Sequence, residues 1–121
     1  WREEIPYVQD MLNFVVRKQL ERMLSWKVGI MTNFSVSVGK SAKYMYKWVS
    51  AQEWEKYLQT YCGADVEAIW QSVECMCLLF VETATWVAGE LHYEYNDTEA
   101  NNGMYFLRSV KDLPKDAGEV L

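Results

Sequence analysis

The sequence predicts an all-α fold, a helical bundle of about five helices that forms a single domain over residues 1–121. Three observations support this prediction. Apolar residues recur at three- and four-residue steps over long stretches, as in amphipathic helices. Gly (6) and Pro (2) are scarce for a fold of many short strands, which needs frequent turn residues. A chain of 121 residues, 50% of them hydrophobic, is long enough for one compact core and short for two full domains.

Two long helices are expected to form the centre of the bundle. The first runs from Ile5 to Val28, with Pro6 near its start, where a missing N–H is tolerated, and Gly29 after it as a left-handed cap. The second follows Asp65, whose carboxylate is a good N-cap, and continues to Leu91. Because it is the most apolar segment, we expect it to be the central helix.

Shorter helices are expected in the rest of the chain. One pattern covers Ser41–Trp48, directly after a Gly turn, and another covers Ala51–Tyr61. Ser50 and Glu53 have the spacing of a capping box, in which each side chain accepts a hydrogen bond from the other residue's backbone amide. A last helix is expected to include Met104–Lys111.

Charge and cysteine content limit the classes of partner. Seventeen acidic and twelve basic residues give a formal net charge of -5, which disfavours nucleic acid as a partner and favours a polycationic small molecule. The three cysteines have neither disulfide-framework nor zinc-ligand spacing, which indicates a reducing, cytoplasmic setting. The sequence has no uninterrupted apolar run of about 18 residues, so no membrane association is expected.

Residues 35–44 contain the most informative polar motif. A Gly turn that leads into a helix N-terminus presents free backbone amides, and Lys40 and Lys43 add positive charge, so phosphate is a candidate ligand. A Walker A loop is excluded because Phe34 stands where its first Gly is needed, five residues before Gly39. The alternative is a helix start with two solvated lysines.

The N-terminal segment is a second candidate binding site. Trp1 offers an aromatic face, and Glu3 and Glu4 offer carboxylates that would accept charge-assisted hydrogen bonds from a ligand rich in ammonium and hydroxyl groups. The alternative is an acidic helix start with nothing bound, since carboxylates favour first turns.

Several separated motifs, in order, resemble one enzyme family. The sequence is similar to the aminoglycoside 6-adenylyltransferases, which modify streptomycin. The resemblance covers residues 1–95 and is carried by Trp1-Arg2-Glu3-Glu4-Ile5, Met23-Leu24-Ser25-Trp26 with Val28-Gly29, Phe34-Ser35-Val36-Ser37-Val38-Gly39-Lys40, Ser50 to Trp54, Ile69-Trp70 and Leu79-Phe80.

This resemblance implies a division of labour between two domains. The family joins an N-terminal nucleotidyltransferase domain to a helical C-terminal domain, with ATP and drug between them; this chain would be the helical, substrate-binding domain without its N-terminal partner. Lys40, with Lys43 as a second residue, would contact the ATP phosphates, and Trp1, Glu3 and Glu4 would contact the aminoglycoside.

The chemistry itself is expected outside this chain. Nucleotidyl transfer needs carboxylates that hold Mg²⁺ against the triphosphate, usually as an Asp-x-Asp pair, and no two Asp residues here are one residue apart. We therefore expect this chain alone to have no catalytic or metal-binding residues and to be inactive. Two alternatives stay open: a helical interaction or dimerisation module without ligand, such as a homodimer, and a family member that uses another nucleotide or acceptor.

Overall fold

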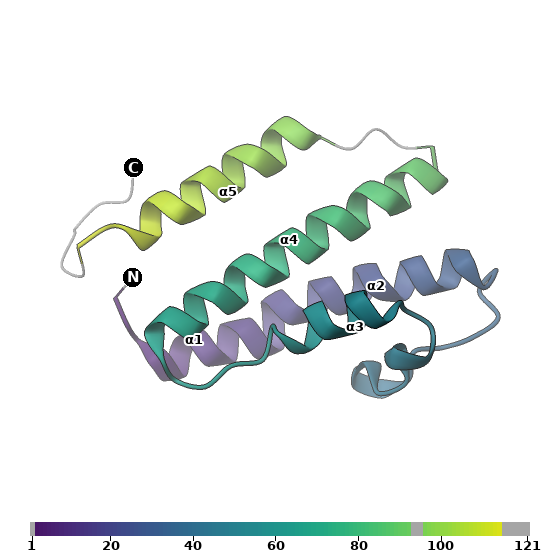
Figure 1. The fold of residues 1–121 in the computed structure, drawn as a ribbon, viewed down its shortest axis with the longest axis horizontal. Helices are drawn as coiled ribbons and strands as arrows, with labels where there is room; N and C mark the ends of the chain where they lie inside the picture. Colours follow the sequence, from purple (N-terminus) through teal and green to yellow (C-terminus); the bar gives the residue numbers. More distant parts are fainter. Residues whose placement is uncertain (1, 93–95, 115–121) are drawn as a thin grey trace.

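The computed structural model describes residues 2–92 and 96–114, and over these residues it contains helices and turns but no strand (Figure 1). In chain order the elements are α1 (Ile5–Met11), the π-helical turn η1 (Leu12–Val16), α2 (Arg17–Met31), the 3₁₀ turns η2 (Lys40–Ala42) and η3 (Met45–Lys47), α3 (Ala51–Leu58), α4 (Val66–Glu90) and α5 (Asp97–Lys111). Since α1, η1 and α2 follow one another without a break, the described residues form four helices, near the five expected. The all-α prediction is confirmed.

The first long helix extends beyond its predicted end. It continues to Met31, and Gly29 is a buried helical residue, so the prediction that Gly29 is a left-handed cap was wrong. The left-handed residues are Asn33 (φ 55°) and Phe34 (φ 57°), and the Phe34 amide donates to the Gly29 carbonyl at 2.6 Å. A Cβ on Gly29 would lie 2.5 Å from the Phe34 ring, so the ring in its present position packs against a residue without a side chain.

The helix predicted over Ser41–Trp48 is also wrong, since this segment forms two three-residue 3₁₀ turns. The backbone explains the difference. Gly39 (φ 80°), Ser41 (φ 54°) and Ala42 (φ 59°) are all left-handed, a conformation that an α-helix of L-residues cannot include. Ala42 and Met45 are buried, so one side chain from each turn anchors the segment to the body of the protein.

The two predicted helix starts at Ser50 and Asp65 are confirmed. The Ser50 hydroxyl accepts from the Glu53 amide (3.1 Å), and the Ser50 amide donates to the Glu53 carboxylate (3.2 Å), which is the complete capping box. The Asp65 carboxylate accepts from the Ala68 amide at 2.9 Å. Helix α3 ends at Leu58, three residues before the predicted end.

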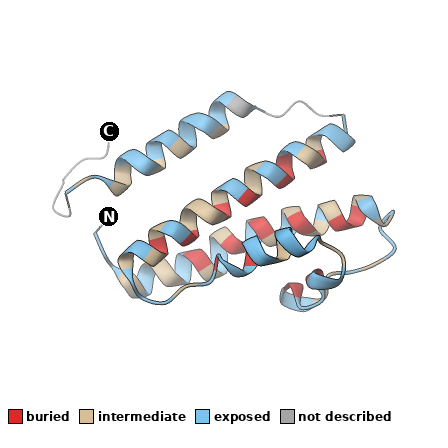
Figure 2. Cartoon of the chain, in the orientation of Figure 1, coloured by how far each residue is buried: buried red, intermediate tan, exposed pale blue. Residues whose placement is uncertain are grey.

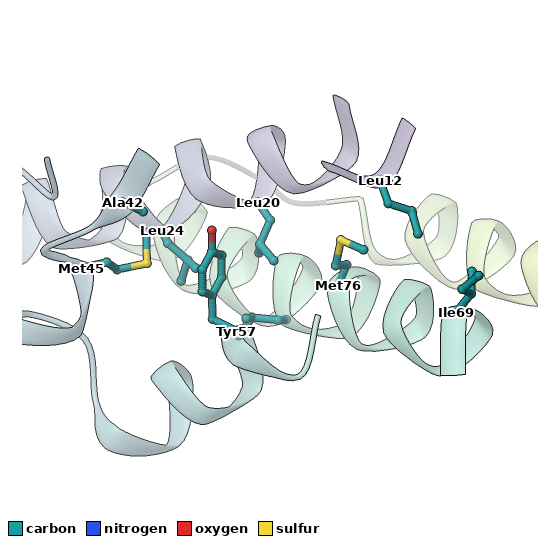
Figure 3. Packing of buried hydrophobic residues seen from close by; sticks show 9 residues of the cluster. Leu12, Leu20, Leu24, Ala42, Met45, Tyr57, Ile69 and Met76 are labelled. Carbon is teal, nitrogen blue, oxygen red and sulfur yellow. The ribbon is translucent and has the colours of Figure 1, made fainter. Parts of the chain in front are cut away.

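The core lies where the α1–α2 helix, α3 and α4 meet (Figures 2 and 3). Helix α4 is the central helix, as predicted, because it packs against both α2 and α3 and also contacts α5. The buried apolar cluster consists of Leu12, Leu20, Leu24, Ala42, Met45, Tyr57, Ile69, Met76 and Leu79. None of the described side chains of α5 is buried, and Figure 2 shows this helix at the edge of the bundle.

By length and composition, α4 is apolar enough to cross a membrane, with a mean hydropathy of 1.3 in its most apolar 18-residue window. One such helix is weak evidence for a span, because core helices of soluble bundles meet the same criterion. Here Ile69, Met76 and Leu79 contribute to the core described above. The central position of α4 explains part of its apolar composition, since 33% of this window is buried.

Candidate functional site

Both lysines that the sequence predicts as phosphate ligands lie in the segment of η2 and η3: Lys40 begins η2, and Lys43 lies between the two turns. The turn after Gly39 was expected to present free amides, but most of these amides are used within it. The Ala42 amide donates to the Gly39 carbonyl (3.1 Å), the Lys43 amide to the Lys40 carbonyl (3.3 Å) and the Tyr44 amide to the Val38 carbonyl (2.7 Å). The Lys40 and Ser41 amides donate no hydrogen bond within the described residues, so this segment offers an anion these two amides and its lysine side chains.

The lysine side chains of these turns extend from the surface. Lys40 and Lys43 are both exposed, and neither forms an ion pair with any carboxylate of residues 2–92 and 96–114. The Lys43 ammonium lies 4.9 Å from the centroid of the Tyr44 ring, and the Lys47 ammonium lies 4.8 Å from the same centroid. Sequence reasoning missed Lys47 and Tyr44, although Lys47 follows Lys43 at a four-residue step that brings side chains together in helical turns.

The N-terminal carboxylates lie elsewhere in the molecule. Glu3 and Glu4 are exposed and directly precede α1, and Glu3 has a left-handed backbone (φ 59°). Glu3 borders a small hollow of ≈ 120 Å³ that is otherwise lined by apolar side chains, including Ile5 and Trp70. Trp1, the third predicted drug contact, lies outside the described residues.

The two predicted binding segments are not brought together. Glu3 and Glu4 precede the first turn of the α1–α2 helix, whereas Lys40 follows its last turn, and Figure 1 places the N-terminus and the 3₁₀ turns toward different ends of this helix. At about 1.5 Å per residue, a helix from Ile5 to Met31 is about 40 Å long. Phosphate and drug contacts made by these residues would thus belong to two separate subsites.

A groove between α3 and α4, which sequence reasoning did not identify, has a size typical of ligand pockets. Its volume is ≈ 670 Å³, and its polar lining includes Glu74 and Glu82. Both carboxylates are already paired, Glu74 with Arg108 (2.7 Å) and Glu82 with Lys56 (3.0 Å). A cationic ligand would therefore compete with Lys56 and Arg108 for the charge of these carboxylates.

The described residues offer no group of side chains that fits a metal ion. Among residues 2–92 and 96–114, no three His, Cys, Asp or Glu side chains are grouped so that they could hold one. Burial raises the pKa of the Cys75 thiol, with the Lys56 charge opposing it, and burial and the Glu74 charge raise the pKa of Cys77. Raised thiol pKa values disfavour the thiolate, the form that binds metals and attacks substrates.

Similarity to known proteins places the chain in a family. By fold it is an all-helical bundle, and it superposes on the crystal structure of an aminoglycoside 6-adenyltransferase from Bacillus subtilis with a TM-score of 0.81. The two sequences are 29% identical, and the match covers 93% of this chain and 42% of that chain. The model of the family described as streptomycin adenylyltransferase matches residues 1–110. The chain belongs to this family.

Curated relatives give the same result and show how much of each relative the chain represents. The aminoglycoside 6-adenylyltransferases of Campylobacter jejuni and Bacillus subtilis are 36% and 33% identical to the chain over 110 and 109 residues, which are 91% and 86% of this chain. The chain spans 38% of the length of each relative and corresponds to their C-terminal region.

Proposed function

We propose that this chain is the substrate-binding C-terminal domain of an aminoglycoside 6-adenylyltransferase, which transfers AMP from ATP to a hydroxyl of streptomycin or a similar aminoglycoside. The observation that carries this proposal is the family match over residues 1–110. The names of the relatives, all aminoglycoside 6-adenylyltransferases, support the reaction class.

In this proposal the present chain binds and orients substrates. Lys40, with Lys43 beside it, contacts phosphate oxygens of ATP, because an ammonium without a carboxylate partner can neutralise the charge of the triphosphate. The exposed position of both lysines supports this role. Mg²⁺ would be held by carboxylates of a nucleotidyltransferase domain, since the described residues of this chain contain no group that fits a metal ion.

Glu3 and Glu4, with Trp1, are the proposed contacts for the aminoglycoside. Carboxylates suit a ligand that carries several ammonium or guanidinium groups, because hydrogen bonds between opposite charges are stronger than neutral ones. Their distance along the α1–α2 helix from Lys40 requires the drug to extend away from the phosphates.

The reaction is tested with the full-length protein, ATP, Mg²⁺ and a panel of aminoglycosides. We expect release of pyrophosphate and, by mass spectrometry, a drug that carries one AMP group. If no aminoglycoside in the panel, streptomycin included, is adenylylated by well-folded protein, the proposal is wrong.

Kinetics then separate the two subsites. Lys40→Ala should lower kcat/KM for ATP about tenfold, which corresponds to about 1.4 kcal/mol, and leave the KM for the drug near its original value. The double variant Glu3→Gln and Glu4→Gln should do the reverse, raising the KM for the drug and leaving the KM for ATP unchanged. Wild-type ATP kinetics in Lys40→Ala would remove this lysine from the phosphate site.

A helical interaction module is the alternative function, and exposed aromatic side chains favour it. Phe14 and Tyr105 are 71% and 76% exposed, and aromatic side chains are enriched at protein–protein interfaces. Such a module would self-associate in size-exclusion chromatography and give no heat in calorimetry on addition of ATP or drug. The proposed enzyme, in contrast, must bind both ligands.

A further inference from the structure

Positive charge is concentrated around the turns η2 and η3. From Arg22 to Gln52 the sequence contains no Asp or Glu, although the chain as a whole has a formal net charge of -5. The basic residues of this segment are Arg22, Lys27, Lys40, Lys43 and Lys47. A local excess of positive charge in an acidic protein creates a potential that attracts anions to one place on the surface.

The lysines of the two turns differ from the lysines of the helices. Elsewhere in the described residues, carboxylates pair with Lys18, Lys27, Lys56 and Lys111. No described carboxylate pairs with Lys40, Lys43 or Lys47. Their charge is therefore not offset within residues 2–92 and 96–114.

The Tyr44 ring lies close to two of these ammonium groups. The Lys43 and Lys47 nitrogens lie 4.9 and 4.8 Å from its centroid, and Lys47 is also 6.0 Å from the Tyr46 ring. The negative face of an aromatic ring attracts a cation at such distances, which offsets the repulsion between two like charges. Tyr44 thus contacts both lysine head groups, and this shared contact is what could position them.

The position of the Tyr44 ring is itself constrained. A Cβ on Gly39 would lie 2.6 Å from Cδ2 of Tyr44, so the ring occupies the space that only glycine leaves open. Ala42 and Met45, on either side of Lys43 and Tyr44 in the sequence, are 2% and 0% exposed and anchor the backbone in the core. The lysine head groups therefore extend from a rigid base, which lowers the entropic cost of ordering them around a ligand.

We propose that Lys47 is a further ligand of the nucleotide polyphosphate, acting with Lys40 and Lys43, and that Tyr44 is the residue that positions Lys43 and Lys47. The identity of the ligand as ATP rests on the proposed function. Binding of a polyanion at this cluster does not depend on any reaction with a drug.

Direct binding of inorganic tripolyphosphate to the full-length protein, by calorimetry without Mg²⁺, tests the cluster. Lys47→Ala should weaken binding about tenfold through loss of one charge-assisted contact, whereas Lys47→Arg should retain most of the affinity. Lys18→Ala is the matched control, because Lys18 is a surface lysine with a carboxylate partner. The affinity of this variant for tripolyphosphate should stay within about twofold of wild type. Wild-type affinity in Lys47→Ala would overturn the proposal.

Salt dependence and ring variants give a second readout. The plot of log affinity against log salt concentration should become shallower in Lys47→Ala than in Lys18→Ala, since fewer charges contact the anion. Tyr44→Phe keeps the ring face and should bind as wild type, whereas Tyr44→Leu should bind more weakly at an unchanged melting temperature. Equal affinity of the Phe and Leu variants would exclude the positioning role of Tyr44.

The two proposals fail separately in these experiments. If tripolyphosphate binding depends on Lys47 but no aminoglycoside is adenylylated, the anion site stands and the proposed reaction is wrong. If drugs are adenylylated and Lys47→Ala changes neither tripolyphosphate affinity nor the KM for ATP, the reaction stands and the role of Lys47 is wrong.

Discussion

At the scale of single residues, Arg17 is the side chain whose role was least visible in the sequence. It is only 5% exposed, and its Nε and Nη2 donate to the side chain and the carbonyl of Thr60 at 3.0 and 2.7 Å. Nη1 donates to Asn13, and the guanidinium lies 3.8 Å from the centroid of the Tyr61 ring. The Thr60 carbonyl also accepts from the Ser72 hydroxyl, so one polar cluster joins the first helix, the end of α3 and α4.

Replacing Arg17 should therefore destabilise the whole domain. Arg17→Ala removes both of these hydrogen bonds, which leaves the buried Thr60 hydroxyl oxygen without a donor and the Thr60 carbonyl with Ser72 alone. We expect the free energy of unfolding to fall by about 2–4 kcal/mol. Urea denaturation measures this change. The control is Lys18→Ala, at the next residue, which is exposed; it should change the free energy of unfolding by less than about 0.5 kcal/mol. A similarly small change in Arg17→Ala would contradict the role of the cluster.

At the scale of elements, the α3 capping box is linked to two other helices. Lys27 of α2 donates to the Glu53 carboxylate at 2.7 Å, and its ammonium lies 5.1 Å from the Trp86 ring of α4. Burial tends to raise the pKa of Glu53, but Lys27 and the Ser50 amide and hydroxyl outweigh burial and hold the pKa below its ordinary value of 4.5. Glu53, which caps α3, is therefore linked to α2 through Lys27, and Lys27 in turn contacts α4 through Trp86.

This link predicts a pH dependence of stability. Because the folded pKa of Glu53 is below the unfolded value, its contribution is complete above pH 4.5 and is lost as the pH falls through the folded pKa. Lys27→Met removes the main partner, so the free energy of unfolding should fall less than in wild type on acidification from about pH 5 to about pH 3. Urea titrations at both pH values test this, with Lys27→Arg, which keeps the charge, expected to behave as wild type.

At the scale of the whole molecule, α5 is the least firmly attached helix. Two exposed ion pairs join it to α4, Arg108–Glu74 (2.7 Å) and Lys111–Glu67 (2.9 Å), and such pairs contribute little to stability. A hollow of ≈ 660 Å³ lies between α5, α4 and the first helix, and its lining is almost entirely apolar. Incomplete packing of this kind lowers the free energy needed for local opening.

Hydrogen exchange should reveal this difference between helices. We expect the amides of α5 to exchange faster than those of α4 between Met76 and Val87, because the α4 amides are protected by the core. Mass spectrometry of the exchanged full-length protein compares the two segments directly. Equal protection would mean that α5 opens only with the rest of the fold.

Much of this architecture follows from local physical chemistry in the sequence. Apolar periodicity predicts the long helices, and the Ser50–Glu53 and Asp65 caps predict two helix starts to the residue, because a cap is an interaction within four residues of chain. The motifs around Lys40 also predict the family, which the match over residues 1–110 confirms.

Other features were decided only by the tertiary structure. Burial of Ala42 and Met45, together with the left-handed backbone at Gly39, Ser41 and Ala42, converts the helix predicted after Gly39 into two 3₁₀ turns. Periodicity could not predict this, since the cost of a left-handed backbone is offset by long-range contacts. Periodicity also could not predict that two lysines lie near the Tyr44 ring. Nor could it predict that Glu3 and Glu4 lie far from Lys40. The sequence by itself determined the helices and the family, and the packing between helices determined which charged side chains lie together.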